Sequence, residues 1–483
     1  MKEITDKIKS FFEVHHPDPI LSFEKIPKSG GDRIYFRIQT SSGSYIATYN
    51  ENIRENEAFL HFSSALKEAQ APVPQIYEID DSQTMYLQED LGSLSLLDHL
   101  EKEGYSDHVY SLYQKSLKSL AWLQIKGDAV IDYSHSITSR EFGKQAIMSD
   151  LLYFKYYFLD TLKIPYDKEM LISEFEDLSA YLDRVESKYF MFRDFQSRNI
   201  YIQHESPYFI DYQGGMKGAL QYDAASLLWQ AKANLPDSWK NELLEYYMDA
   251  VSEILQRPLD RSRFTSQYNG YVLIRLLQVL GAYGFRGLFE RKAHFLISIP
   301  LGLSNLKWFL EHKETGISLP EFERILRLVV DDQIMERFRP AQANPDTPLV
   351  VTINSFSYLK DGYPVTETEG AGGFVFDCRG IENPGRQEVF KVQNGRDKPV
   401  KDFLEQQTRM PEFLNSVYTL ADIAVENYLE RGFTSLVFNF GCTGGQHRSV
   451  YAADALVRHL RNKFKVKVDL HHLQQNIHEK KGF

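Results

Sequence analysis

The chain has 483 residues, of which 43% are hydrophobic and 13% aromatic. This length predicts about two or three hydrophobic cores, and the composition excludes long disordered stretches. The formal net charge of -11 at pH 7 argues against a protein that coats nucleic acid through its overall charge, although a local basic face stays open.

Two further features predict a cytoplasmic protein. Cys378 and Cys442 are the only cysteines, too few for a disulfide framework. The first ten residues carry many charges and no apolar signal core, and no uninterrupted apolar run is long enough to span a bilayer. We therefore expect a reducing compartment and no membrane partner.

The N-terminal part predicts a helix and a small antiparallel sheet. Apolar residues at helical spacing predict a helix over 2–12. Strands are expected over 22–26, 33–39 and 44–49, because Gly- and Ser-containing turns separate these runs. A helix over 55–67 follows, and residues 85–92 predict a strand that ends in a hinge.

Helices dominate from Leu97 onward. They are expected over 110–123, 148–162, 226–232, 240–255, 268–285, 289–297, 304–310 and, as the last, 320–330. The histidines show no metal-ligand spacing, so surface or core roles are expected for them. A Pro-rich polar stretch then predicts a linker over 336–348, which separates a domain over 1–335 from a second domain over 349–483.

The second domain predicts an α/β layout with a largely parallel sheet. Strands are expected at 349–354, 435–440 and 466–470, with helices over 419–431 and 450–464. Lysines at 463, 465 and 467 alternate through the expected last strand. They could follow an RNA phosphate backbone, but a solvated edge strand guarded by lysines is the preferred interpretation.

Three oxygen-bearing side chains lie at the ends of short apolar runs between Tyr189 and Gln213. One run leads to Asp194, a polar loop follows to Asn199, and a second apolar run ends on Asp211. Phosphoryl transfer needs a carboxylate that accepts a hydroxyl proton and oxygen ligands that hold Mg²⁺ against nucleotide phosphates. The ordered set D-x4-N and apolar-apolar-D therefore predicts a phosphotransferase site.

These motifs carry a family resemblance. R-D-F-x-S-R-N-I, F-I-D-Y-Q and, at 222–228, Y-D-x-A-S-L-L resemble the aminoglycoside phosphotransferase and choline kinase-like family, and most of all its anomeric amino-sugar kinases. The resemblance implies an α+β, bilobal, protein-kinase-like domain with an N-lobe over about 1–90 and a helical C-lobe over 91–335. Phe192 stands where the family usually has His, a structural rather than catalytic position.

The resemblance also implies roles for individual residues. Asp194 and Arg193 would be catalytic, and Asn199 and Asp211 would bind Mg²⁺. ATP would be bound by Gly30, Gly31, Arg33, Glu57, Gln88, Glu89 and Asp90. The strand 45–49 lacks the lysine that most kinases of this fold carry, as the amino-sugar kinases also do, so Arg33, Arg37 or Lys28 would supply the positive charge.

The loop from Gly441 to Ser449 is a second chemical feature. Glycines let backbone amides converge, a helix N-terminus follows, and Arg448 adds a forked donor, so the loop predicts an anion site. The spacing of Cys442, Arg448 and Ser449 also matches the C-x5-R-S/T of cysteine-dependent phosphatases.

A second resemblance covers most of 347–468. G-C-T-G-G-x-H-R-S-V-Y, V-F-D-C-R, N-P and D-K-P-V resemble the C-terminal domain of the RNase adapter protein RapZ, which senses glucosamine-6-phosphate and contacts small RNAs. It implies a sugar-phosphate pocket of Asp377, Arg379, Cys442, Thr443, Gly444, Gly445, His447 and Arg448. Gln446 replaces the usual Lys, which weakens the case for RNA, and the adapter's P-loop motif does not occur in this chain. The adapter family forms oligomers, so a homo-oligomer is one expectation.

Three functions follow from these motifs. The preferred one is an ATP-dependent amino-sugar kinase with a sugar-phosphate effector domain. The second is a nucleotide-binding pseudokinase joined to a sugar-phosphate or RNA-binding module. The third is a kinase and phosphatase fusion that uses Cys442 as the nucleophile.

Overall fold

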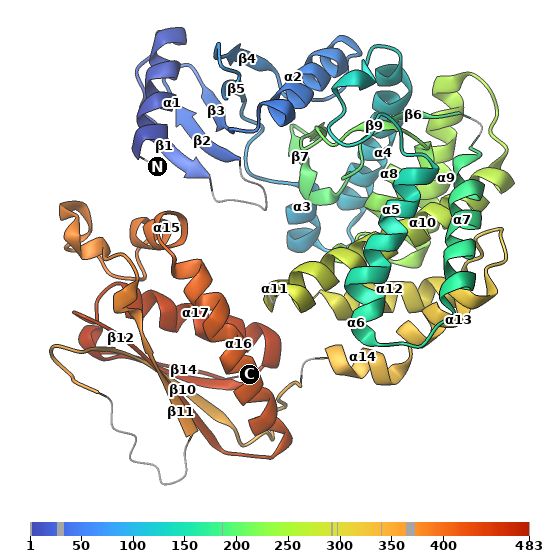
Figure 1. Cartoon of the computed structure of the whole chain (residues 1–483). Helices are drawn as coiled ribbons and strands as arrows, with labels where there is room; N and C mark the ends of the chain where they lie inside the picture. Colours follow the sequence, from blue (N-terminus) through green and yellow to red (C-terminus); the bar gives the residue numbers. More distant parts are fainter. Residues whose placement is uncertain are drawn as a thin grey trace. The chain divides into compact units, whose positions relative to one another are not determined.

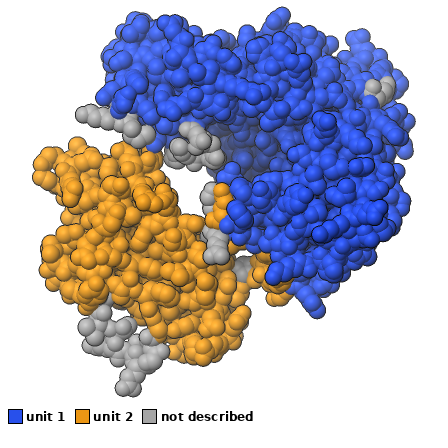
Figure 2. All heavy atoms as spheres, in the orientation of Figure 1, with its two compact units in different colours: residues 1–289, 298–335 blue, residues 290–297, 336–483 orange. Residues whose placement is uncertain are grey.

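The computed structural model describes residues 2–26, 33–185, 187–290, 293–296, 298–339, 341–363 and 372–482. It divides into two compact units (Figure 2). Unit 1 comprises Met1–Phe289 and Ser298–Met335, and unit 2 comprises Glu290–Ile297 and Glu336–Phe483. Lys28, Gly30 and Gly31, for which phosphate contacts were predicted, lie outside the described residues.

Unit 1 begins with a five-stranded antiparallel sheet in the order β1-β2-β3-β5-β4 (Figure 1). Its strands are β1 (Ser22–Ile26), β2 (Ile34–Gln39), β3 (Ser44–Tyr49), β4 (Ile76–Ile79) and β5 (Met85–Glu89). Helix α1 (Lys2–His15) packs Ile8 and Phe12 against Phe36 and Ile38 of β2. Helix α2 (Ile53–Glu68) lies between β3 and β4 in the chain and begins at the N-cap Asn52.

The rest of unit 1 is mainly helical (Figure 1). Its helices are α3 (Leu96–Glu103), α4 (Asp107–Asp128), α5 (Lys144–Phe154), α6 (Asp160–Leu162), α7 (Lys168–Asp183), α8 (Leu220–Leu228), α9 (Asp237–Leu255), α10 (Arg261–Tyr283), α12 (Ile299–His312), α13 (Pro320–Val329) and α14 (Asp332–Phe338). Two small antiparallel sheets of two strands interrupt them: β6 (Tyr189–Met191) pairs with β9 (Met216–Gly218), and β7 (Ile200–Gln203) pairs with β8 (Ser206–Phe209).

Several predicted helix boundaries are wrong. The helix expected at 226–232 begins at Leu220, so Asp223 lies inside α8 and its side chain reaches the loop after β6. The helix expected over 148–162 changes to π-helix at Lys155–Leu159. The helix at 320–330 is followed by α14, which extends into the predicted linker, and the helix predicted at 289–297 is reduced to α11 (Ala293–Leu296) among the described residues.

One described segment, Arg261–Phe289, is long and apolar enough by length and composition to cross a membrane. It consists of α10 and a π-helix over Gly284–Phe289. More than half of its apolar window is buried inside the structure, where α10 contacts α5, α8 and α12. A core helix of a globular domain passes the same test, so this segment is weak evidence for a membrane span.

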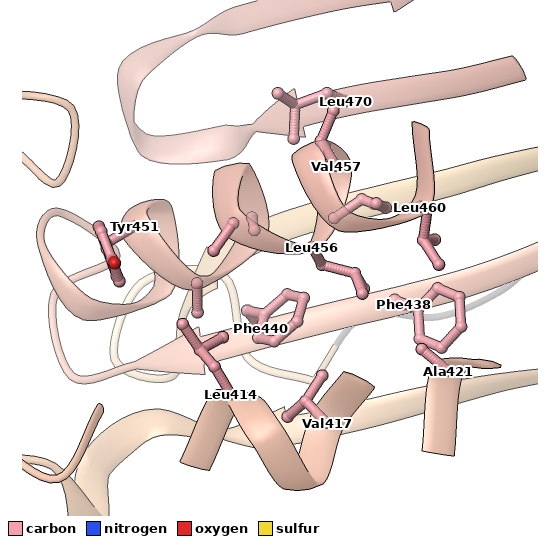
Figure 3. Packing of buried hydrophobic residues seen from close by; sticks show 14 of the residues in the cluster. Leu414, Val417, Ala421, Phe438, Phe440, Tyr451, Leu456, Val457, Leu460 and Leu470 are labelled. Atoms are coloured by element: carbon pink, nitrogen blue, oxygen red, sulfur yellow. The ribbon is translucent and has the colours of Figure 1, made fainter. Parts of the chain in front are cut away.

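Unit 2 contains a mainly parallel sheet in the order β11-β12-β10-β13-β14. Its strands are β10 (Val350–Ser357), β11 (Gly372–Asp377), β12 (Ser435–Cys442), β13 (Lys467–His472) and β14 (Ile477–Lys481), of which only β14 is antiparallel to its neighbour. The helices that follow β11 are α15 (Lys398–Gln407), α16 (Met410–Glu430) and α17 (Arg448–Phe464). Figure 3 shows Phe438 and Phe440 of β12 packed between side chains of α16 and α17.

Unit 2 also differs from the predictions. Helix α15 and strands β11 and β14 were not predicted, and α16 begins nine residues before the expected Thr419 because Met410, Leu414 and Val417 are core residues. Lys463 lies in α17 and Lys465 is its C-cap, so the lysines do not alternate through a strand. Lys463 instead pairs with Asp422 at 2.9 Å and Glu426 at 3.0 Å.

The predicted fold class is confirmed. An antiparallel sheet followed by a helical lobe is the bilobal α+β layout expected of a kinase-like domain, and unit 2 is an α/β domain with a largely parallel sheet.

Candidate functional site

A buried carboxylate holds the peptide that leads into the predicted catalytic loop. Asp223 accepts hydrogen bonds from the backbone N–H groups of Phe192 at 2.7 Å and Arg193 at 2.9 Å, and from Nε2 of Gln124 at 2.9 Å. Asp223 is completely buried, and this burial raises its pKa to about 7 against the effect of the three donors. Asp223 therefore fixes the backbone immediately before Asp194.

Arg193 and Asp211 have left-handed backbone conformations. Arg193 has a φ of 79° and Asp211 a φ of 72°. Such conformations cost about 1–3 kcal/mol each and persist where surrounding contacts hold them, often at functional sites. Asp223 holds the N–H of Arg193, and Nε2 of Gln213 donates to Oδ1 of Asp211 at 2.7 Å.

The structure brings Asp194, Asn199 and Asp211 together. Nδ2 of Asn199 donates to the carbonyl oxygen of Asp194 at 2.9 Å and to Oδ2 of Asp211 at 3.3 Å. Both of these bonds use the amide nitrogen of Asn199, so its oxygen and the Asp211 carboxylate can face a ligand. Carboxylate and amide oxygens are the donors that Mg²⁺ prefers, and the arrangement fits a divalent cation of that kind.

Each of two arginines near the loop pairs with a different carboxylate. Arg275 on α10 is 4% exposed, and its Nη2 donates to Oδ1 of Asp194 at 3.2 Å. Arg193 instead donates to both carboxylate oxygens of Asp150, at 2.9 and 3.3 Å. Asp194 itself keeps about half of its side chain exposed, as a base that must meet a substrate requires. Arg193, predicted to be catalytic, therefore holds the loop, and Arg275 contacts the candidate base.

Of the two described candidates for the missing positive charge, Arg33 pairs with a glutamate of α2, whereas Arg37 pairs with Asp90. Nη2 of Arg33 lies 3.1 Å from Oε1 of Glu55 on α2, and the guanidinium stacks over Phe59 with its carbon 5.4 Å from the ring centre. Arg33 is buried, and its Nε has no hydrogen-bond acceptor among the described residues. Glu57, the predicted helix glutamate, points to solvent on another face of α2, so this prediction is corrected to Glu55.

Two of the predicted hinge residues, Gln88 and Glu89, are the last residues of β5, and Asp90 follows the strand. Gln88 is buried in the sheet opposite Ile46, and Glu89 accepts a hydrogen bond from the backbone N–H of Gln75 at 3.0 Å. Asp90 accepts two hydrogen bonds from Arg37, at 2.7 and 2.9 Å, and one from Ser44 at 2.5 Å. The side chain of Asp90 thus fixes the hinge. Arg37, one of the candidates for the missing positive charge, is paired with this carboxylate.

An aromatic column connects the loops to the N-terminal sheet. The Phe192 ring lies 5.9 Å from Tyr212, Tyr212 stacks on Phe59 at 5.1 Å, and Phe59 stacks on Tyr86 at 5.3 Å. The hydroxyl of Tyr212 also lies 2.7 Å from Oγ of Ser63 on α2. Phe192, in the position where a His was expected, is completely buried and serves this packing.

The Gly-rich loop of unit 2 runs from the end of β12 to the start of α17. The backbone N–H groups of Thr443 to His447 donate to no acceptor within the described part of the chain, and no side chain caps α17. Gln446 fixes the loop from outside, because its Nε2 donates to the carbonyl oxygens of Lys391 at 3.0 Å and Gln393 at 2.7 Å. Unpaired loop amides at a helix N-terminus can bind an anion such as phosphate.

The side chains predicted for the sugar-phosphate pocket surround this loop. Arg448 is 4% exposed and donates to the carbonyl oxygens of Arg379 at 3.2 Å and Ile381 at 2.7 Å, and to Oγ1 of Thr443 at 3.3 Å. These contacts join the loop to the segment after β11. Arg379 is half-exposed, pairs with Asp377 at 2.6 Å, and is the guanidinium that remains accessible.

Two other predicted pocket residues lie beside the loop. Nε2 of His447 lies 2.9 Å from the carbonyl oxygen of Phe390. Sγ of Cys442 lies 3.1 Å from Oγ of Ser449, and both side chains are buried. Cys378 is also buried, and burial raises the pKa of its thiol well above the ordinary range. A buried thiol at the end of a central strand is a core residue, which disfavours a phosphatase nucleophile.

Sequence reasoning missed Asp150, Asp223, Glu55 and Arg275 as site residues. The Y-D-x-A-S-L-L element did contain Asp223, but its role requires the helix to start at Leu220. Asp150 and Arg275 carry no local motif, because each reaches the loop from a helix far away in the sequence.

Both parts of the chain are similar to known protein families. Residues 22–256 match the sequence model of the phosphotransferase enzyme family, and residues 349–476 match that of the RapZ C-terminal domain. A nucleotide-binding protein of Clostridium botulinum is 33% identical over 135 residues, which are 28% of this chain and 44% of that protein. A nucleotide-binding protein of Fervidobacterium nodosum is 37% identical over 121 residues, 25% of this chain and 41% of that protein. The chain thus spans less than half the length of these curated relatives.

Solved structures resemble the chain at low identity. A choline/ethanolamine kinase family protein from Mesorhizobium loti is 13% identical, with a TM-score of 0.44, and the match covers 68% of this chain and 98% of that one. An ethanolamine kinase of Plasmodium vivax is 15% identical, with a TM-score of 0.41, over 60% of this chain and 82% of that one. The two sequence matches assign residues 22–256 to a domain of the phosphotransferase enzyme family and residues 349–476 to a RapZ C-terminal domain.

Proposed function

We propose that this chain is an ATP-dependent phosphotransferase that acts on a hydroxyl group of an amino sugar of the N-acetylmuramate or N-acetylglucosamine type. The observation that carries the proposal is the hydrogen-bonded set of Asp194, Asn199 and Asp211, which offers a base and two oxygen ligands at one place. We place this activity in a domain over 1–335, with a linker over 336–348 and an effector domain over 349–483, in a cytoplasmic protein.

The roles of the residues follow from their contacts. Asp194 accepts the proton of the attacking hydroxyl, and Arg275 holds its carboxylate in place. Asn199 and Asp211 would hold Mg²⁺, which neutralises phosphate charge when bound. Arg33, oriented by Glu55, directs a buried positive charge toward the nucleotide side of the site. The residues from Gln88 to Asp90 would present backbone groups to adenine.

The effector domain would bind a hexosamine phosphate such as glucosamine-6-phosphate. The unpaired amides of Thr443 to His447 would receive the phosphate, and the accessible Arg379 would add a charge-assisted contact. Arg448 contributes by holding Thr443 and the segment after β11 together. This assignment keeps Asp377, Cys442, Gly444, Gly445 and His447 in the walls of the pocket.

The decisive experiment measures ATP turnover with N-acetylmuramate, N-acetylglucosamine, choline and an aminoglycoside. The native chain is compared with Asp194→Asn and with Asp81→Asn, a matched change at an exposed turn residue. We expect turnover with an amino sugar that Asp194→Asn abolishes and Asp81→Asn preserves. If no acceptor is phosphorylated while nucleotide still binds, the chain is a pseudokinase and the proposal fails.

A further inference from the structure

Strands β13 and β14 carry three metal-ligating side chains that the proposed activity does not use. Asp469 and His471 lie two residues apart on β13, so they share one face of the strand. His478 on β14 lies directly opposite His471 in the antiparallel ladder. The pairing register therefore collects two imidazoles and one carboxylate on the same face of the sheet.

The donor atoms of the three side chains converge. Nε2 of His471 lies 3.2 Å and Nε2 of His478 lies 2.5 Å from the same oxygen, Oδ1 of Asp469. The two imidazole rings stack with their centres 4.0 Å apart and their planes 24° apart. All three ligand atoms lie within 4.8 Å of one another, and the side chains are 22–50% exposed, so an ion can enter from solvent.

We propose that Asp469, His471 and His478 form a binding site for a late first-row divalent ion of the Zn²⁺ class. In a tetrahedral Zn²⁺ site with Zn–N and Zn–O bonds of about 2.0–2.2 Å, ligand atoms lie about 3.3–3.5 Å apart. The separation between Asp469 and His471 is already close to this value, and the separation between Asp469 and His478 has to widen by less than about 1 Å. Two imidazoles with one carboxylate favour Zn²⁺ or Cu²⁺ over Mg²⁺ or Ca²⁺.

Three protein ligands leave one position of a tetrahedral site for water or another ligand. The site would also join the two strands on either side of a short 3₁₀ segment, Leu473–Gln475. Within this segment, Nε2 of Gln475 donates to the carbonyl oxygen of Gly445 at 3.0 Å. The ion would therefore stabilise a connection that contacts the Gly-rich loop.

Unit 1 contains a second group with similar composition, formed by His99, Glu103 and His108. There, the two histidines contact different oxygens of Glu103, and His108 also contacts Glu205 at 2.9 Å. The hydrogen bonds of this group connect α3, α4 and the β7–β8 turn, and this structural role explains why the side chains lie close together. A change at His108 is therefore the matched control.

The test titrates the full-length, metal-free chain with Zn²⁺ by calorimetry and with Co²⁺ by visible absorption. We expect His471→Ala and His478→Ala each to weaken Zn²⁺ binding by at least about tenfold, the scale of effects known for metal-site residues, and His108→Ala to leave it unchanged. Zn²⁺ should raise the unfolding temperature of the native chain but not of His478→Ala. Metal-free unfolding temperatures establish that the variants are folded, and Asp469→Asn provides a second variant.

Equal Zn²⁺ affinity in the native chain and in folded His471→Ala and His478→Ala would overturn the proposal. So would a loss of Zn²⁺ binding in His108→Ala alone. Both measurements are independent of ATP turnover. They therefore test the metal site separately from the proposed kinase activity.

Discussion

Nη2 of the buried Arg275 donates a hydrogen bond to Oδ1 of Asp194 at 3.2 Å. This contact crosses from α10 to the loop after β6 and connects residues 81 positions apart in the sequence. Nη1 of Arg275 donates to Oε1 of Gln278 at 2.7 Å, so the guanidinium is oriented from its own helix. The candidate base is thus held by a side chain that a neighbour on its own helix orients.

Replacement of Arg275 by Ala should lower kcat. The Asp194 carboxylate loses its partner, and misplacement of a catalytic group by about 1 Å costs on the order of 100-fold in rate. We expect KM for ATP to change little, because the hydrogen bonds of Arg275 go to Gln278 and Asp194 and to none of the predicted nucleotide residues that the structure describes. Steady-state kinetics checks this, with Arg263→Ala as the control on the exposed face of the same helix. An unchanged kcat in a folded Arg275→Ala protein would show that the contact has no role in catalysis.

Two glutamates on α2 offer a sharp comparison for nucleotide binding. Glu55 forms the ion pair with Arg33, whereas Glu57 is exposed. Glu55→Gln should weaken ATP binding by about tenfold, which corresponds to about 1.4 kcal/mol, because Arg33 loses the charge that orients it. Glu57→Gln should leave the Kd unchanged. Calorimetric titration with a non-hydrolysable ATP analogue measures both, and equal Kd values in the two variants would contradict the role of the pair.

The sequence predicted Asp194, Asn199 and Asp211 because these three residues lie within one short, ordered motif. It selected Glu57 as the helix glutamate, whereas Glu55 forms the ion pair with Arg33, because the docked face of α2 decides between the two and the periodicity of that helix is weak. Arg275 could not be predicted, since its contact depends on how α10 packs. The approach of His478 to Asp469 likewise depends on strand register, which histidine spacing along the chain does not encode.

The Gly-rich loop contains two neighbouring glycines with different requirements. Gly445 has a φ of 66°, and a Cβ there would lie 2.5 Å from Cγ of Gln474. Gly444 has no atom within 4 Å of an added Cβ and no left-handed backbone. Gly445→Ala should therefore destabilise the chain by at least about 1–2 kcal/mol, while Gly444→Ala should keep its stability. Urea denaturation compares the two variants.

The Gly444→Ala variant also tests the proposed anion site. In Gly444→Ala the methyl group occupies open space beside the loop amides, so we expect glucosamine-6-phosphate to bind more weakly although the fold is intact. Calorimetric titration measures the change. Native affinity in Gly444→Ala would place the phosphate elsewhere.

The buried Asp223 predicts a specific pH dependence of stability. Its pKa is raised from the ordinary value near 3.8 to about 7 in the folded chain. Between these two pH values, the native state therefore holds a proton on Asp223 that the unfolded state has lost. The contribution of Asp223 to the free energy of unfolding is therefore largest below about pH 4 and decreases as pH rises to about 7. The full decrease is on the order of 4 kcal/mol, and it ends above pH 7.

Asp223→Asn isolates this contribution, because Asn does not titrate. We subtract the unfolding free energy of Asp223→Asn from that of the native chain. This difference should fall as pH rises from about 4.5 to about 7 and then stay constant. Urea denaturation at a series of pH values measures it, and Asp81→Asn, at an exposed turn, should show no such trend. A difference that instead grows with pH would mean that the three hydrogen-bond donors outweigh burial and keep Asp223 ionised in the folded chain, anchoring the backbone before Asp194 as a carboxylate.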